Sequence, residues 1–276
     1  MIYITINSKG GVGKSTFASS ILTAYLFVKN KEKTKLIEID DENKDSIIFN
    51  KTKIFDSKII KTKEIEKIDE IFFTNDDVII DIGGNKTASL FLQEIEKIGL
   101  QEKEFTKIVW CIPLGRGMQD GANALDTHNF IKNIDANAKI LFVLSASNSE
   151  NQEELEFEFL NFFGHKILKT PFAIMQKEYI TDVKYVSVKN SNLVNNSRSF
   201  FQTIFDISLN ETDYATQLRE IMREIMENKK SNLRNIELED KLERTKFYNR
   251  MKITAKAYVD YMEKDLFKQI NKELED

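Results

Sequence analysis

The apolar residues of this chain follow two patterns in alternation, short continuous runs and stripes at helical spacing. Continuous runs predict buried strands over 2–6, 35–40, 76–85 (ending in a glycine turn), 107–114, 139–145 and 165–172. Helical spacing between them predicts helices over 17–30, 88–100, 118–134 and 151–163. The Lys- and Ile-rich range 44–75 is ambiguous and leaves room for one or two short helices. This alternation predicts an α/β domain whose mostly parallel sheet is covered by helices on both faces.

From about residue 211 onward the pattern becomes helical only. Two sets of residues follow helical stripes with charges between them: Leu238, Leu242, Thr245 and Tyr248, and Met262, Leu266, Ile270 and Leu274. The Asn-, Lys- and Ser-rich range 228–235 predicts a break between helices. We therefore expect a domain over 1–210 and a C-terminal helical extension over 211–276. The extension either completes the core or receives a partner.

The composition is that of an ordinary water-soluble protein. Of 276 residues, 41% are apolar and 30% are charged, with a net charge of −4, which argues against a protein that coats nucleic acid with its whole surface. Cys111 is the only cysteine, which excludes an internal disulfide and a cysteine cluster for zinc or iron–sulfur within one chain. The N-terminal stretch lacks a basic segment, and the apolar runs are far shorter than the ~18 residues of a membrane helix. We expect a cytoplasmic protein.

The stretch NSKGGVGKST, residues 7–16, joins the first predicted strand to the first predicted helix. Backbone N–H groups of such a loop bind phosphates, and its glycines allow them to approach closely. The predicted nucleotide-binding residues here are Gly10, Gly11, Val12, Gly13, Lys14, Ser15 and Thr16. Lys14 would reach the β- and γ-phosphates of ATP, Ser15 would bind Mg²⁺, and Thr16 would bond the α-phosphate. Ser8 stands where the pattern G-x-x-x-x-G-K-[ST] begins with glycine.

Carboxylates suited to a metal follow two of the predicted strands. Asp81 closes VIID, the pattern of a Walker B element, and Asp40 closes LIEID. In a parallel sheet both strand ends open onto the edge that carries the glycine loop. We predict Asp81 as a ligand of Mg²⁺, usually through water. Asp41 and Glu42 remain alternatives for the role of Asp40.

The motif KGGVGKST, with Lys9 before the paired glycines, resembles the deviant Walker A loop of the ParA/MinD family of ATPases. LIEIDDEN and VIIDIGG are similar to the second motif and the Walker B element of that family, and the resemblance covers residues 1 to about 170. It implies a three-layer P-loop NTPase fold, ATP and Mg²⁺ as ligands, and a homodimer that forms with ATP between the subunits. Lys9 would then reach the phosphates of the second subunit, and Asp40 would orient the attacking water, so Lys9, Lys14 and Asp40 are the predicted catalytic residues.

The sequence also departs from the family pattern. Glu38 replaces the first Asp of the second motif, and Gly83 and Gly84 replace paired prolines in a loop expected to sense the γ-phosphate. These departures indicate a compact, divergent member, closer to small plasmid-encoded partition or transfer ATPases. For the nucleobase, the resemblance favours Pro171 over Asn148, which follows its strand about three residues late.

Several functions remain open. The resemblance favours a slow, partner-stimulated ATPase that positions plasmid DNA or a related cargo and binds nonspecific DNA when loaded with ATP. The alternatives are an ATP-dependent regulator of conjugation or secretion machinery with little turnover, and a dethiobiotin-synthetase-type ligase.

Membrane anchoring is disfavoured because the final stretch EKDLFKQINKELED is mildly acidic. The lysines between 29 and 67 alternate with acidic residues, which favours a solvated face over a DNA-binding patch. The glycine-containing loop 113–123, with Arg116, either belongs to a dimer interface, contacts a partner, or is a plain strand-to-helix connection.

Overall fold

The computed structural model describes residues 1–41, 48–49, 51–73, 75–100, 102–165, 167, 170, 173–176, 180, 183–227 and 232–275. Within them, one seven-stranded sheet has the order β3-β2-β4-β1-β5-β6-β7, and every neighbouring pair is parallel. The strands are β1 (Ile2–Thr5), β2 (Thr34–Ile39), β3 (Phe55–Ile60), β4 (Val78–Ile82), β5 (Ile108–Leu114), β6 (Lys139–Ser147) and β7 (Lys184–Lys189). The predicted α/β class and parallel sheet are confirmed.

The two strands at the edges of the sheet differ from the sequence prediction. β3 lies in the ambiguous range 44–75, and β7 lies beyond the predicted strand 165–172, most of which is outside the described residues. Each of these strands contains lysine and serine among its apolar residues. An edge strand has a partner on one side only and is often polar, so its apolar pattern is weaker than that of a central strand.

Helices cover both faces of the sheet. Ile2 and Ile4 of β1 belong to one buried cluster, and Tyr3 belongs to a second cluster on the opposite face. The first cluster includes apolar residues of α5 (Lys86–Ile98) and α7 (Met118–Ile134), and the second includes those of α2 (Thr23–Asn30) and of the C-terminal helices. The fold therefore has three layers, as predicted.

The remaining helical elements are shorter, except in the C-terminal region. They are α1 (Lys14–Thr16), η1 (Phe17–Leu22), η2 (Thr62–Ile68), α4 (Asp69–Phe72), α6 (Glu102–Phe105), α8 (Gln152–Glu158), α9 (Leu160–Phe163), η3 (Ile174–Gln176), α10 (Asn192–Asn196), η4 (Ser197–Phe200), α11 (Ile204–Ser208), α12 (Tyr214–Glu227), α13 (Asn232–Tyr261), η5 (Met262–Leu266) and α14 (Phe267–Glu275). Among the described residues, none of these helices combines the length and the apolar character that crossing a bilayer requires.

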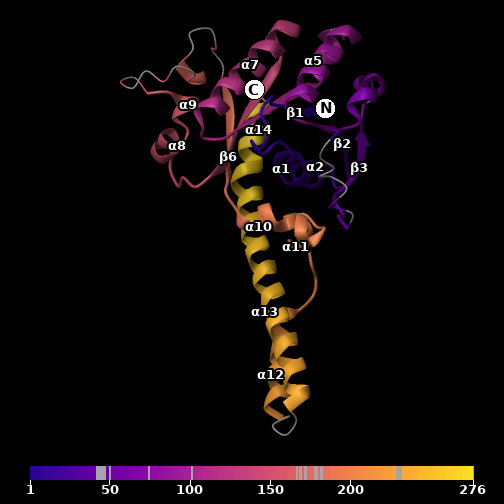
Figure 1. The fold of residues 1–276 in the computed structure, drawn as a ribbon, viewed down its shortest axis with the longest axis vertical. Helices are drawn as coiled ribbons and strands as arrows, with labels where there is room; N and C mark the ends of the chain where they lie inside the picture. The colour runs from indigo at the N-terminus through magenta and orange to yellow at the C-terminus, as the bar shows by residue number, and fades with distance from the viewer. Residues whose placement is uncertain are drawn as a thin grey trace.

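The C-terminal region is helical, as predicted, and has two parts. α12 and the first half of α13 form a hairpin that projects from the domain (Figure 1). The end of α13, η5 and α14 return to the sheet, and their apolar residues are buried in the second cluster: Ala255, Val259, Met262, Leu266, Phe267 and Ile270. The Tyr25 hydroxyl of α2 donates a hydrogen bond to Asn271 Oδ1 at 2.6 Å. The region therefore completes the core at its end and extends away from it at its start.

Candidate nucleotide-binding site

The glycine loop leaves β1 at the carboxyl edge of the sheet and runs into the helix formed by α1, η1 and α2. Gly11 and Gly13 have φ values of 75° and 93°, a left-handed conformation that glycine adopts at little cost. A Cβ atom at Gly13 would lie 2.8 Å from Ser145 Oγ, whereas one at Gly10 or Gly11 would meet nothing within 4 Å. The loop backbone thus borders open space in front of a helix N-terminus, where phosphate oxygens can bind.

The loop lines a cavity of about 750 Å³. This cavity brings together all of the loop residues predicted to bind nucleotide, from Gly10 to Thr16, with Asp40, Gly83 and Gly84. Its other end is lined by Gly115, Arg116, Val143, Ser145, Ala146, Val188, Asn190 and Arg198. The size falls within the range of small-molecule and cofactor sites. Pro171 lies outside the described residues, so its base contact stays a prediction.

Lys14 is buried at the base of the loop. Its side-chain Nζ donates a hydrogen bond to the backbone oxygen of Lys9 at 2.8 Å. Burial lowers the pKa of Lys14, and the carboxylates of Asp81 and Asp40 oppose that shift. The ammonium group is therefore enclosed by the loop and faces two acidic groups, an arrangement in which a phosphate can replace the Lys9 carbonyl as its partner.

Asp81 lies beside Lys14, almost fully buried at the end of β4. Its Oδ1 accepts a hydrogen bond from Thr5 Oγ1 at 2.7 Å. Burial raises the pKa of Asp81 to about 7, while hydrogen bonds from Ser15 and Thr5 lower it and the charge of Glu38 raises it. Glu38 is buried on β2 at the position that pairs with Asp81.

Oxygen ligands suited to Mg²⁺ therefore meet at the foot of the loop. The hydroxyl of Ser15 and the carboxylate of Asp81 are the donor types that this cation prefers, and it usually takes its other ligands from water and the substrate phosphates. The residues present fit the predicted metal role of Ser15 and Asp81. No cluster of three or more His, Cys, Asp and Glu side chains suited to a metal occurs in the described part of the chain.

Asp40 packs against the start of the segment that follows β4. A Cβ atom at Gly83 would lie 2.8 Å from Cγ and Oδ2 of Asp40, so glycine is required for this close approach. The neighbouring Asp41 instead accepts a hydrogen bond from the backbone N–H of Thr62 at 2.9 Å, which lowers the pKa of Asp41. Asp40 lines the 750 Å³ cavity and Asp41 does not. Glu42, the other alternative, lies outside the described residues.

The segment after β4 also touches the glycine loop. The backbone N–H of Asn85 donates to the Ser8 oxygen at 2.6 Å. A Cβ atom at Gly84 would lie 3.2 Å from the backbone nitrogen of Gly10. The segment therefore lies directly against the glycine loop, and its role in sensing the γ-phosphate stays a prediction.

Lys9 is held outside the cavity lining. Its Nζ forms an ion pair with Asp120 Oδ1, and its side chain remains 37% exposed. Asp120 lies in the first turn of α7, and its second carboxylate oxygen accepts a hydrogen bond from the backbone N–H of Gly117 at 3.2 Å. A Cβ atom at Gly115 would lie 2.5 Å from that oxygen, so this glycine makes room for the carboxylate. The first lysine of the loop thus has a partner within its own chain.

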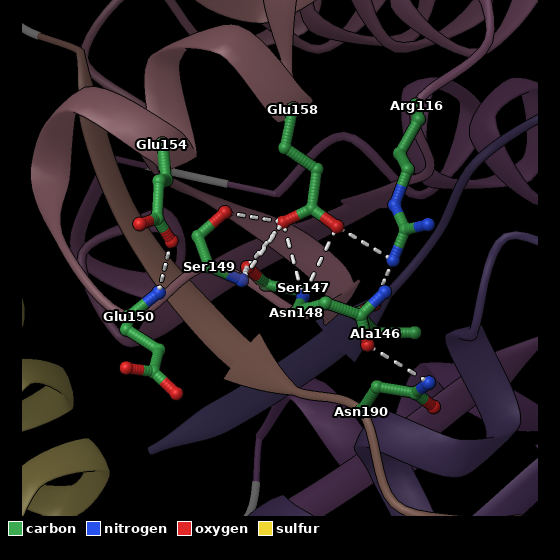
Figure 2. A network of polar contacts seen from close by, with 9 residues as sticks. All are labelled: Arg116, Ala146, Ser147, Asn148, Ser149, Glu150, Glu154, Glu158 and Asn190. Carbon is green, nitrogen blue, oxygen red and sulfur yellow. Dashed lines mark hydrogen bonds and ion pairs between the residues drawn. The ribbon is translucent and has the colours of Figure 1, made fainter.

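A second carboxylate organises the other end of the cavity (Figure 2). Glu158 accepts hydrogen bonds from the hydroxyls of Ser147 and Ser149 at 2.7 and 2.5 Å, and from the backbone N–H of Asn148 at 3.0 Å. It also pairs with the Arg116 guanidinium at 2.7 Å. Burial raises the pKa of Glu158, but these hydrogen bonds and the nearby guanidinium lower it, and the net shift is downward. Glu158 therefore fixes the loop after β6 as a carboxylate.

Arg116 joins two loops at this end of the cavity. Besides Glu158, it donates to the backbone oxygen of Ala146, whose φ of 57° is left-handed. The Asn148 side chain accepts a hydrogen bond from Asn190 Nδ2 at 3.1 Å (Figure 2). Arg116 thus ties the loop after β5 to the end of β6 and to α8, and whether it also lies at an interface stays a prediction.

Comparisons with known proteins add structural neighbours. No protein-family model and no curated protein matches the sequence. Among solved structures, the chain is similar to the MinD cell division protein of Aquifex aeolicus, with 10% identity, a TM-score of 0.48, and coverage of 76% of this chain and 91% of that one. A putative plasmid partition protein from Borrelia burgdorferi B31 bound to AMPPNP is also similar, with 14% identity, a TM-score of 0.43, and coverage of 73% and 90%.

The MinC:MinD complex of Aquifex aeolicus is similar as well, with 13% identity, a TM-score of 0.43, and coverage of 74% of this chain and 87% of that one. The similarity is to ParA/MinD-type proteins. Identities of 10–14% and TM-scores below 0.5 decide nothing about the function of this chain, so the site itself has to support the function.

The sequence did not single out four residues that the structure places in or behind the site: Asp120, Glu158, Asn190 and Arg198. Only Asp120 had a local signal, an acidic residue in the first turn of a helix that follows a glycine loop. The other three lie in polar stretches without a motif.

Proposed function

We propose that this chain is an ATP-binding and ATP-hydrolysing switch protein of the ParA/MinD type, which dimerises with ATP between two subunits. The observation that carries the proposal is the different placement of the two lysines of one loop. Lys14 is buried within the cavity, whereas Lys9 lies beside it with its side chain 37% exposed. A cation at the rim of its own site is suited to the phosphates of a second subunit, where it stabilises charge on the transferring phosphoryl oxygens.

The remaining roles fall to residues of the same subunit. The loop N–H groups and Lys14 bind the β- and γ-phosphates of ATP, and Thr16 binds the α-phosphate. Ser15 and Asp81 hold Mg²⁺, which neutralises charge on the phosphates when it is bound. Asp40 orients the water that attacks the γ-phosphorus, and ADP and phosphate are the products.

The proposed cellular role is the positioning of plasmid DNA or a related cargo, with a partner protein that stimulates slow hydrolysis. It follows from the likeness of the loop and the second motif to the family. Surface charge supports a solvated face rather than a DNA patch at the start of the lysine-rich range, because Lys33 and Lys35 pair with Asp56 and Asp76 at 2.8 and 2.5 Å.

Light scattering after size-exclusion chromatography, with ATP and with ADP, tests the dimer. We expect wild type to dimerise with ATP, Lys9→Ala to bind ATP as a monomer, and Lys14→Ala to lose nucleotide binding. Lys29→Ala, on the surface of α2, is the matched control and should behave as wild type. Dimerisation of Lys9→Ala at the wild-type ATP concentration would show that the role of Lys9 in a second subunit is wrong.

A second experiment separates the alternatives. An ATP-dependent shift of nonspecific DNA that disappears at raised salt supports the partition role. A release of ADP that depends on an added small molecule, without a DNA shift, supports a ligase instead. ATP binding and dimerisation without measurable hydrolysis supports a regulator with little turnover.

A further inference from the structure

A second cavity lies at the root of the projecting hairpin, away from the glycine loop. Its volume is about 310 Å³. We call it the root pocket, and it is lined by Lys51, Ser199, Phe200, Phe201, Gln202, Ile207, Asn210, Tyr214, Tyr248, Met251 and Lys252. Most of these residues come from η4, α11, α12, α13 and the turns beside them, where α11 lies beside α13 (Figure 1). Lys51 comes from the segment before β3. The size matches the lower end of ligand pockets.

Aromatic rings form the walls of the root pocket, and its charged groups are cationic. Tyr214 stacks on Tyr248 with ring centroids 6.0 Å apart. The Lys252 Nζ lies 6.0 Å from the Tyr214 ring, and the Lys51 Nζ lies 5.7 Å from the Phe201 ring. No carboxylate is among the described residues that line the pocket, although the chain as a whole has a net charge of −4. The pocket therefore offers apolar faces next to positive charge.

Phe201 is held in a strained conformation at the mouth of this pocket. Its φ of 57° and ψ of 23° are left-handed, which costs roughly 1–2 kcal/mol for a residue with a side chain. The ring is nevertheless 46% exposed, so it gains only part of the burial energy that would offset this cost. Strained residues of this kind occur preferentially at binding sites.

The short helix η4 connects the root pocket with the nucleotide cavity. Arg198 of η4 lines the nucleotide cavity, and Ser199 and Phe200 of the same helix line the root pocket. The backbone N–H of Lys51 also donates to the Phe201 oxygen at 3.3 Å, which holds the end of η4 in place. Arg198 and Phe200 therefore lie two positions apart on one short helix that borders both cavities.

We propose that the root pocket binds an acidic segment of a partner protein, in which an aromatic or large aliphatic side chain stands beside carboxylates. The carboxylates pair with Lys51 and Lys252, and the apolar side chain packs on the rings. Occupancy is coupled to the nucleotide cavity through η4, a step that rests on the function proposed above. A nucleic-acid strand fits less well, because it needs a continuous basic groove, whereas Lys51 and Lys252 are the only cationic side chains among the described residues that line the pocket.

An array of capped ten-residue peptides that vary in charge and aromatic content tests the binding step on the full chain. We expect wild type to select acidic peptides with Phe, Trp or Leu. Fluorescence anisotropy of the best peptide should show at least tenfold weaker binding to Phe201→Gly and to Lys51→Glu. Phe201→Gly suits this test because glycine adopts the left-handed conformation without strain, so the fold is preserved.

Matched controls come from exposed residues elsewhere. Phe73→Ala and Lys58→Glu should bind the same peptide within twofold of wild type. Equal binding by Phe201→Gly and Lys51→Glu, an array without selection for acidic apolar peptides, or binding of labelled oligothymidylate in place of peptide would each overturn the proposal.

The coupling between the root pocket and the nucleotide cavity is measured separately. Peptide affinity with and without saturating ADP should differ at least threefold, because coupling between two binding sites is reciprocal. ADP binding is measured separately with a fluorescent analogue. If ADP binds and peptide affinity stays the same, the coupling is overturned. If ADP itself does not bind, the proposed nucleotide function is wrong. The peptide proposal is then still decided by the affinities of Phe201→Gly and Lys51→Glu.

Discussion

At the scale of single residues, Asp81 gives the site a clear pH signature. Its pKa is raised from 3.8 to about 7, so the fold favours the protonated carboxyl. This contribution to stability is fully present below pH 3.8 and is lost as the pH rises through about 7. Without nucleotide, wild type should therefore lose roughly 2–4 kcal/mol of unfolding free energy relative to Asp81→Asn between pH 4 and 8.

Urea unfolding of both proteins at the two pH values measures this difference. Asp56→Asn, at an exposed position on β3, is the control and should track wild type at both. If the difference in unfolding free energy between wild type and Asp81→Asn does not change with pH, burial does not raise the pKa of Asp81.

The ion pair between Lys9 and Asp120 leads to a second prediction about single residues, on the variant Asp120→Asn. Asp120→Asn keeps an oxygen for the Gly117 N–H but removes the charge that holds Lys9. Because the pair is partly exposed, the stability change should stay within about 1 kcal/mol. If Lys9 must leave Asp120 to reach a second subunit, the variant should dimerise at a several-fold lower ATP concentration. Light scattering over an ATP series measures the midpoint, and an unchanged or higher midpoint would refute this role for Asp120.

The sequence predicted the site residues that belong to the loop motif or that end a buried strand, and missed those that act through contacts across the fold. Gly10 to Thr16 follow one another, so spacing alone identifies them. Lys9 and Asp120 are 111 positions apart, and only the packing of α7 beside the loop brings them together. Glu158 supports the site through backbone groups and hydroxyls, which have no sequence signature.

At the scale of elements, the turn after β4 depends on Gly83. A Cβ atom there would lie 2.8 Å from the Asp40 carboxyl, so Gly83→Ala must displace Asp40. We expect nucleotide binding within threefold of wild type and an ATP hydrolysis rate reduced at least tenfold, as in Asp40→Asn. Lys97→Ala, an exposed position near the other end of α5, should leave both unchanged. A fully active Gly83→Ala would show that the position of Asp40 does not limit turnover.

The last helix, α14, should contribute to the stability of the domain. Ile270 is fully buried in the second cluster, and Lys268 on the same helix is exposed. Ile270→Ala should lower the free energy of unfolding by about 2–4 kcal/mol, whereas Lys268→Ala should change it by less than about 0.5 kcal/mol. Chemical denaturation measures both. A small effect of Ile270→Ala would mean that α14 is not part of the folded core.

Strands whose two faces are both buried were predictable from the sequence. β1, β4 and β5 lie in the middle of the sheet, and their uninterrupted apolar runs identified them. β3 and β7 lie at the edges, where lysine and serine break the pattern, and the sequence predicted neither strand.

At the scale of the whole molecule, the nucleotide cavity and the hairpin are separate in structure. No residue of the range 211–275 lines the nucleotide cavity in the part of the chain that the structure describes. The hairpin projects from the domain, while the helices that follow it pack on the sheet (Figure 1). The nucleotide site should therefore not depend on the outer part of the hairpin.

Shortening the hairpin tests this separation. Replacing residues 217–245 by a short Gly-Ser linker removes the outer turns and keeps Tyr214, Tyr248 and the buried C-terminal helices. At 100 times the dissociation constant, Mg-ADP stabilises a binding protein by about 2.7 kcal/mol, which corresponds to a rise in Tm of roughly 5–10 °C for a domain of this size. We expect this rise in both the shortened and the full chain, and we expect Lys14→Ala to abolish it in both. If the shortened chain folds but loses the rise in Tm, the outer hairpin acts on the nucleotide site at a distance, and the two parts of the molecule are not independent.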